Sequence, residues 1–96
     1  MMNSTPTEVE VLRTAKKWIE TKGWFSESKG REGIASVCIG IATDYAHKSI
    51  SKEATPAILG FEDMEAVIRW NDAPERAKEE VLARLDERIA FYEVAA

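Results

Sequence analysis

The sequence predicts an all-α protein, with one compact small helical domain over residues 1–96 that frays at 1–4 and 94–96. Its architecture is a buried small-residue central helix with two amphipathic terminal helices. Apolar residues recur at helical spacing near both ends of the chain, and a helix-start signal precedes each of these segments. Between them lies an apolar stretch rich in small side chains. Hydrophobic residues make up 45% and charged residues 31% of the chain, as is typical of one globular domain.

The first helix is predicted over 6–22. Thr5 and Glu8 form a capping-box pair, in which each side chain accepts a backbone N–H of the first turn, and Pro6 fits the first helical position. Gly23 then ends the helix. The stripe expected to be buried comprises Val11, Leu12, Ala15, Trp18 and Ile19.

The middle of the chain changes from polar to apolar. Residues 24–33 are predicted to be a polar loop, because they hold two glycines between charged and hydroxyl side chains. The stretch 34–45 is apolar on every side, which indicates burial on all faces, and its small residues favour a helix over a strand. We therefore expect a central helix over 32–47, against which the other helices pack closely. A strand at this position would overturn the predicted fold.

Two short helical segments are predicted next. Thr55-Pro56 starts the first, which ends at Gly60. Asp63 is placed to cap a second that runs to Trp70, because its carboxylate can accept a free N–H of the first turn.

The last helix is predicted over 73–92. Asp72 is the expected N-cap, Pro74 fits the first turn, and Glu75 stands at the capping-box position three residues after the cap. The stripe expected to be buried comprises Val81, Leu82, Leu85, Ile89 and Tyr92.

Charge and composition exclude several classes of function. Residues 1–48 carry seven basic and six acidic residues (+1), whereas 49–96 carry six and eleven (−5), which gives the net charge of −4. Neither nucleic acid nor membrane is an expected partner, because nonspecific binding to either needs a basic face. One cysteine and one histidine provide neither an internal disulfide nor a structural zinc site. The start of the chain lacks a signal-peptide pattern and no apolar run is long enough to span a bilayer, so we expect a cytoplasmic protein.

No catalytic group stands out. Asp44, Tyr45 and His47 form the densest polar cluster, and an acid/base group there competes with a simpler interpretation, in which a buried helix re-emerges into water. Cys38 is expected to be a buried structural thiol. We therefore predict no catalytic residue, no cofactor, no metal and no enzymatic activity.

Four residues are candidates for binding: Trp24, Trp70, Asn71 and Phe91. For both tryptophans the competing interpretation is a core anchor, since an indole buries a large apolar area. For Asn71 it is a side chain that satisfies the turn between two helices. Phe91 lies off the buried stripe of the last helix, where it either packs the terminus or forms an exposed interaction patch.

Four marks along the chain occur together in a known group of proteins: Gly23-Trp24, Cys38-Ile39-Gly40-Ile41, Trp70-Asn71-Asp72, and Pro74 followed by Glu79-Glu80-Val81. On these marks the chain resembles a family of small uncharacterised proteins encoded by actinobacteria and by the phages that infect them. The Trp-Asn-Asp element is the most specific of the four. Arg76-Ala77 stands where the family pattern often has Arg-Thr. The resemblance implies a fold and a phage or bacterial cytoplasmic setting, and no reaction.

We expect a small non-enzymatic accessory protein that binds a host or phage protein, through an exposed helix face or through 24–33. The alternative is a protein that binds a small nucleotide-like ligand in a pocket near Trp24, Trp70 and Asn71. A homo-oligomer that pairs its last helices through Phe91 is also consistent with the sequence. An enzyme built on the central polar cluster is a third hypothesis, and nucleic-acid binding ranks last.

Overall fold

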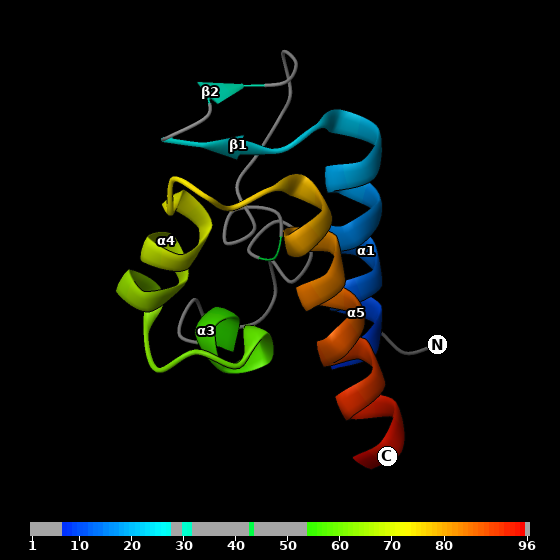
Figure 1. The fold of residues 1–96 in the computed structure, drawn as a ribbon. Helices are drawn as coiled ribbons and strands as arrows, with labels where there is room; N and C mark the ends of the chain where they lie inside the picture. The colour runs from blue at the N-terminus through cyan, green and yellow to red at the C-terminus, as the bar shows by residue number, and fades with distance from the viewer. Residues whose placement is uncertain (1–6, 28–29, 32–42, 44–53, 96) are drawn as a thin grey trace.

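A computed structural model describes residues 7–27, 30–31, 43 and 54–95. In this part of the chain the fold is all-α, as predicted, and the strands contribute only two residues each. Figure 1 shows α1 and α5 side by side, with α3 and α4 to one side of α5. The elements are α1 (Glu8–Lys22), β1 (Phe25–Ser26), β2 (Gly30–Arg31), α3 (Ala54–Leu59), α4 (Met64–Asp72) and α5 (Lys78–Ala95).

Helix α1 confirms the first predicted helix, but its cap lies two residues later than expected. The N-cap is Thr7 and not Thr5: its hydroxyl accepts the Glu10 N–H at 3.2 Å, and the Thr7 N–H donates to the Glu10 carboxylate at 2.8 Å. The sequence contains two overlapping Thr-x-x-Glu pairs, and the structure uses the second. Gly23 ends the helix as predicted, with a φ of 98°.

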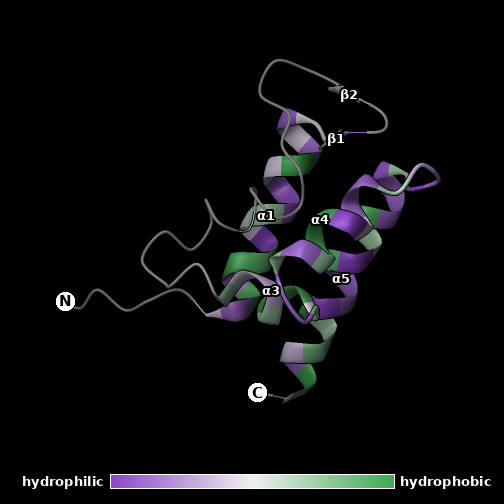
Figure 2. Ribbon diagram, turned by 90° about the vertical axis from the view of Figure 1, so that its left-hand side faces the viewer, coloured by the Kyte–Doolittle hydropathy of each residue, from purple (hydrophilic) through white to green (hydrophobic). Residues whose placement is uncertain are grey.

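The two terminal helices pack against each other through the apolar stripes that the sequence predicted. Hydrophobic and hydrophilic residues both occur along α1 and α5 (Figure 2), as expected for helices that pack through one apolar face. An ion pair joins Lys16 Nζ to Asp86 Oδ1 at 2.8 Å, and Arg13 pairs with Glu93. The hydrogen bond to the Asp86 carboxylate raises the pKa of Lys16 above its ordinary value. The fully buried stripe residues are Val11, Leu12, Ala15 and Ile19 of α1 with Val81 and Leu85 of α5.

The predicted central helix over 32–47 lies outside the described residues, except for Thr43, which is helical and buried. Cys38 and the polar cluster of Asp44, Tyr45 and His47 lie outside them as well. Their predicted roles therefore stay predictions, and so does the fraying at 1–4.

The segment 24–33 was predicted to be a polar loop, and this needs correction. It contains β1 and β2, which pair antiparallel with Phe25 opposite Arg31 and Ser26 opposite Gly30. Ser26 is buried, and so is Trp24 immediately before β1. A strand of two residues is too short to produce the alternation from which strands are recognised in a sequence.

Helix α3 confirms the short helix predicted before Gly60. Gly60 has a φ of 85° and closes the helix with two bonds of a Schellman motif. Its N–H donates to Ala57 O at 3.1 Å, and the Phe61 N–H donates to Pro56 O at 2.8 Å.

Two arginines of α5 bind the C-terminal end of α3. The last carbonyl groups of a helix have no partner within it and carry the negative end of its dipole, so cations are favourable there. Arg84 and Arg88 supply N–H donors to four consecutive carbonyl oxygens, and so attach α3 to α5. Arg84 donates to Leu59 O (Nε, 3.1 Å) and Gly60 O (Nη2, 3.1 Å), and Arg88 to Ile58 O (Nε, 3.0 Å) and Ala57 O (Nη2, 3.3 Å).

Helix α4 begins as predicted but ends later. Asp63 is its N-cap, with Oδ1 accepting the Ala66 N–H at 2.9 Å. The helix continues through Asp72, so the prediction that Asp72 caps the last helix is wrong. Pro74 and Glu75 lie in the turn that follows.

Helix α5 begins at Lys78 rather than at 73, and extends to Ala95. The capping acid is Glu80, whose Oε1 accepts the Ala77 N–H at 2.9 Å, in place of the predicted Glu75.

The contact between Gly60 and the two arginines predicts an unequal cost for two glycine substitutions. A Cβ at Gly60 would lie 2.9 Å from Arg84 Nη2 and 3.1 Å from Arg88 Cζ, and a shift of these guanidinium groups would disturb their hydrogen bonds to the end of α3. We expect Gly60→Ala to lower the free energy of unfolding by about 2–3 kcal/mol, measured by urea denaturation.

Gly30→Ala is the matched control, because Gly30 has a φ of 78° but its Cβ would meet nothing within 4 Å. It should lower the free energy of unfolding only by the backbone strain of an alanine at a positive φ, about 1 kcal/mol. Equal losses in the two variants would contradict the role given to the arginine contacts.

Candidate functional site

Trp24 and Asn71 are joined by a buried hydrogen bond across 47 positions of sequence. The indole Nε1–H of Trp24 donates to Asn71 Oδ1 at 2.7 Å, and both side chains are buried. The Asn71 amide donates in turn to Phe25 O at 3.0 Å and to Asp72 Oδ1 at 3.0 Å. Asp72 Oδ1 also accepts the Glu27 N–H at 3.1 Å. These bonds attach β1 to the C-terminal end of α4.

Two of the candidate binding residues, Trp24 and Asn71, therefore belong to this hydrogen-bonded joint between β1 and α4. The polar atoms of Trp24 and Asn71 bind each other and the backbone of β1, inside the protein. The interpretation of Asn71 as a residue that satisfies a tight turn between two helices is wrong, because Asn71 lies inside α4 and bonds to Trp24 and Phe25, far away in the sequence. Trp24 of the Gly-Trp pair and Asn71 of the Trp-Asn-Asp element each supply one half of a single hydrogen-bonded contact.

Trp70 of α4 is partly buried, packs against the hydrophobic core and is held by its neighbours. The guanidinium carbon of Arg76 stands 4.1 Å from the indole centroid, and Arg76 Nε–H donates to Trp70 O at 2.8 Å. The Phe61 ring lies 5.8 Å away, tilted by 51°. A stacked cation and a tilted ring fix the orientation of the indole.

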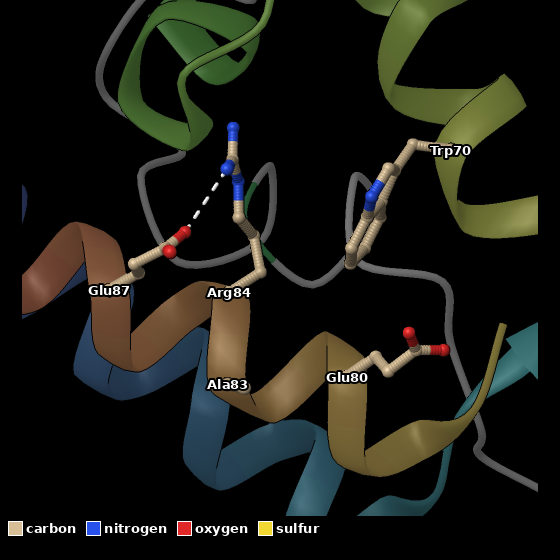
Figure 3. A pocket seen from close by; sticks show the side chains of 5 residues that line it. All are labelled: Trp70, Glu80, Ala83, Arg84 and Glu87. Atoms are coloured by element: carbon tan, nitrogen blue, oxygen red, sulfur yellow. Dashed lines mark hydrogen bonds and ion pairs between the residues drawn. The ribbon is translucent and has the colours of Figure 1, made fainter.

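A groove of about 300 Å³ lies beside this indole, between α4 and α5. Figure 3 shows Trp70 extending from α4 toward α5, Arg84 rising from α5 toward α3, and Ala83 on α5 between the two acids. The small Ala83 side chain leaves space in front of the indole. The groove is lined by Trp70, Glu80, Ala83, Arg84 and Glu87.

The charges of this groove are not equally accessible. Arg84 and Arg76 bind the carbonyl ends of α3 and α4, and their side chains are only 26% and 16% exposed. Their acidic partners Glu87 and Glu80 are 68% and 48% exposed. A molecule that approaches the groove therefore meets carboxylates first.

Phe91 lies apart from the groove lining. It is exposed near the C-terminal end of α5, where the Arg88 guanidinium stands 4.4 Å from its ring centroid and Tyr92 contacts it edge to face at 5.1 Å. It follows Glu87 by four residues, so both lie on one face of α5. Val94, also exposed, continues this face.

Sequence reasoning identified Trp70 but missed the α5 side of the groove. Glu80, Ala83, Arg84 and Glu87 recur at three- and four-residue spacing and so share a helix face. That spacing was a usable signal for a common surface. It gave no indication that Trp70 would lie opposite, because the two helices are joined by a turn of unknown geometry.

Within the stretches that the structure describes, no group of three or more His, Cys, Asp or Glu side chains could hold a metal ion. In the same stretches, no helix combines the length and the apolar character needed to cross a bilayer.

Comparison with known proteins gives one match. The model of a family of unknown function, DUF6197, matches residues 3–91. No curated protein and no solved structure matches the chain.

The joint between Trp24 and Asn71 predicts a measurable coupling. Trp24→Phe removes the indole N–H and leaves a buried amide oxygen without this donor, so we expect a loss of about 2–3 kcal/mol in the free energy of unfolding. A double-mutant cycle with Asn71→Ala should give a coupling of about 1–2 kcal/mol by urea denaturation. The control is a cycle that combines Asn71→Ala with Tyr92→Phe, a change near the C-terminal end of α5. This control cycle should give almost no coupling. A coupling for Trp24 no larger than this control would show that the bond does not form.

Proposed function

The chain belongs to the family of unknown function DUF6197, and from the geometry of its groove we propose a non-enzymatic protein that acts by protein–protein interaction. Its binding surface is the groove between α4 and α5, centred on Trp70. Its partner is a host or phage protein, in the bacterial or phage cytoplasmic setting that the sequence resemblance implies. The observation that carries the proposal is an indole held in a fixed orientation beside an open groove.

The energetics of protein interfaces favour such a residue. A few anchors, among which tryptophan is enriched, supply most of the binding energy of an interface. Trp70 is held between Arg76 and Phe61 before any partner arrives, so little side-chain entropy is lost on binding. The space over Ala83 gives room for a side chain of the partner.

The exposed end of α5 extends this surface. Phe91 and Val94 place apolar area on the helix face that also carries Glu87. Apolar patches on a helix face are common interaction sites. A second copy of the chain that pairs through Phe91 would compete for this end, and sedimentation analysis of the free protein detects it.

A nucleotide-like ligand is less well supported than a protein. Of the three residues that the sequence suggested for its pocket, Trp24 and Asn71 are bonded to each other in the interior, and only Trp70 lines the groove. The exposed rim of the groove is formed by Glu80 and Glu87, whose carboxylates repel phosphate groups.

The proposal predicts that filling the groove abolishes binding without unfolding the protein. Ala83 is an exposed position on a helix, and Ala83→Leu adds bulk in front of Trp70 at little cost in stability. In affinity capture from a lysate of the organism that encodes the chain, read by mass spectrometry, we expect at least one protein that wild type enriches and Ala83→Leu loses.

Ala57→Leu is the matched control, since it makes the same change at an exposed position of α3 outside the groove lining. It should retain the captured protein. Identical recovery with wild type and Ala83→Leu, or nothing above the bead background with any variant, would refute the proposal.

A further inference from the structure

We infer that the groove binds a basic segment of the partner, by taking one lysine or arginine side chain between Glu80 and Glu87 and against the indole of Trp70. This inference rests on the proposed function and specifies the chemistry of the occupant. It is carried by the unequal exposure of the charges around the groove and by its shape.

The arginine side chains near the groove already bind groups of the protein itself. Three N–H groups of Arg84 bind Leu59 O, Gly60 O and the Glu87 carboxylate. Its positive charge therefore lies against the negative end of α3, and its side chain is less exposed than that of Glu87. Arg76 binds Trp70 O at the end of α4 in the same way.

The carboxylates retain the capacity to bind a further cation. Glu87 Oε1 accepts from Arg84 at 3.1 Å, and Glu80 pairs with Arg76 at 3.4 Å. A carboxylate has about four acceptor sites, so each keeps lone pairs that face water. Residues 49–96 as a whole carry a charge of −5 from six basic and eleven acidic residues, and this net charge favours a basic partner.

The shape of the groove fits a long side chain with a charged end. Glu80 and Glu87 are separated by seven residues of α5, about 10.5 Å along the helix axis, with the small Ala83 between them. A lysine or arginine stem can pack its methylene groups against the Trp70 ring while its charged end reaches the carboxylates. A carboxylate or phosphate group would meet the same two acids and be repelled.

The test uses amino-acid amides as probes of the intact 96-residue protein. N-acetyl-arginine amide and N-acetyl-lysine amide are titrated in separate experiments, followed by ¹H–¹⁵N NMR, with N-acetyl-glutamate amide and N-acetyl-leucine amide as comparisons. We expect the indole N–H peak of Trp70 and the backbone peak of Ala83 to move in a saturable way with at least one cationic probe. The glutamate and leucine amides should move them at least about fivefold less at equal concentration.

Two charge-matched double variants make the test specific. Glu80→Gln with Glu87→Gln should weaken binding of the cationic probe roughly fivefold, since the carboxylates that attract its charge are lost. Glutamine still accepts the Ala77 N–H, so the start of α5 is preserved. Glu65→Gln with Glu79→Gln removes the same charge outside the groove lining and should leave binding almost unchanged.

The outcomes separate this inference from the proposed function. Equal shifts with the glutamate or leucine amide, no shift at Trp70 with either cationic probe, or unchanged binding in the Glu80/Glu87 double variant would each overturn the inference. In those cases a partner captured by wild type and lost in Ala83→Leu would still support protein binding at the groove. Selective binding of a cationic probe without any such captured protein would instead refute the proposed function.

Discussion

The described structure depends on one constraint: the carbonyl groups at the C-terminal end of α3 need hydrogen-bond donors from outside the helix. A helix of six residues has little stability of its own, and most of its carbonyl groups lie within its last turn. Arg84 and Arg88 of α5 donate hydrogen bonds to the four carbonyl oxygens of residues 57–60. This fixes α3 on α5, and it also commits the guanidinium of Arg84, which lines the groove, to the end of α3. Glu87 is left as the accessible charge of that pair, and the space over Ala83 stays open. One set of hydrogen bonds therefore determines both the packing of the helix and the electrostatic character of the proposed binding surface.

A second long-range contact holds the opposite end of the structure. The Trp24–Asn71 bond and the amide bond from Asn71 to Phe25 O connect β1 to α4. Because α4 carries Trp70 immediately before Asn71, this joint also determines where the indole stands relative to α5. The Trp70-Asn71-Asp72 segment thus combines residues that hold the structure together with a residue that lines the groove. Its asparagine and aspartate attach the strand, and its tryptophan faces the groove.

The sequence predicts those features that a local pattern encodes. The buried stripes of the two terminal helices follow from spacing alone, as do the cap at Asp63 and the helix ends at Gly23 and Gly60. Features set by distant partners escape this reasoning. Asp72 has the pattern of an N-cap but belongs to the preceding helix, in which Asn71 is bonded to a residue 47 positions away. The sequence does not predict the groove either, since no motif indicates that arginines of one helix will bind the carbonyl groups of another.

Arg84 and Arg88 are committed to the end of α3, which leaves carboxylates as the most accessible charges of the groove. A long-range HNCO spectrum of the ¹³C,¹⁵N-labelled protein tests this arrangement directly, because couplings across a hydrogen bond reveal donor and acceptor together. We expect cross-peaks from Arg84 Nε to the carbonyl carbon of Leu59 and from Arg88 Nε to that of Ile58, with slow exchange of both Nε–H protons. Absent cross-peaks together with rapid exchange would show guanidinium groups free in water, and would contradict this arrangement.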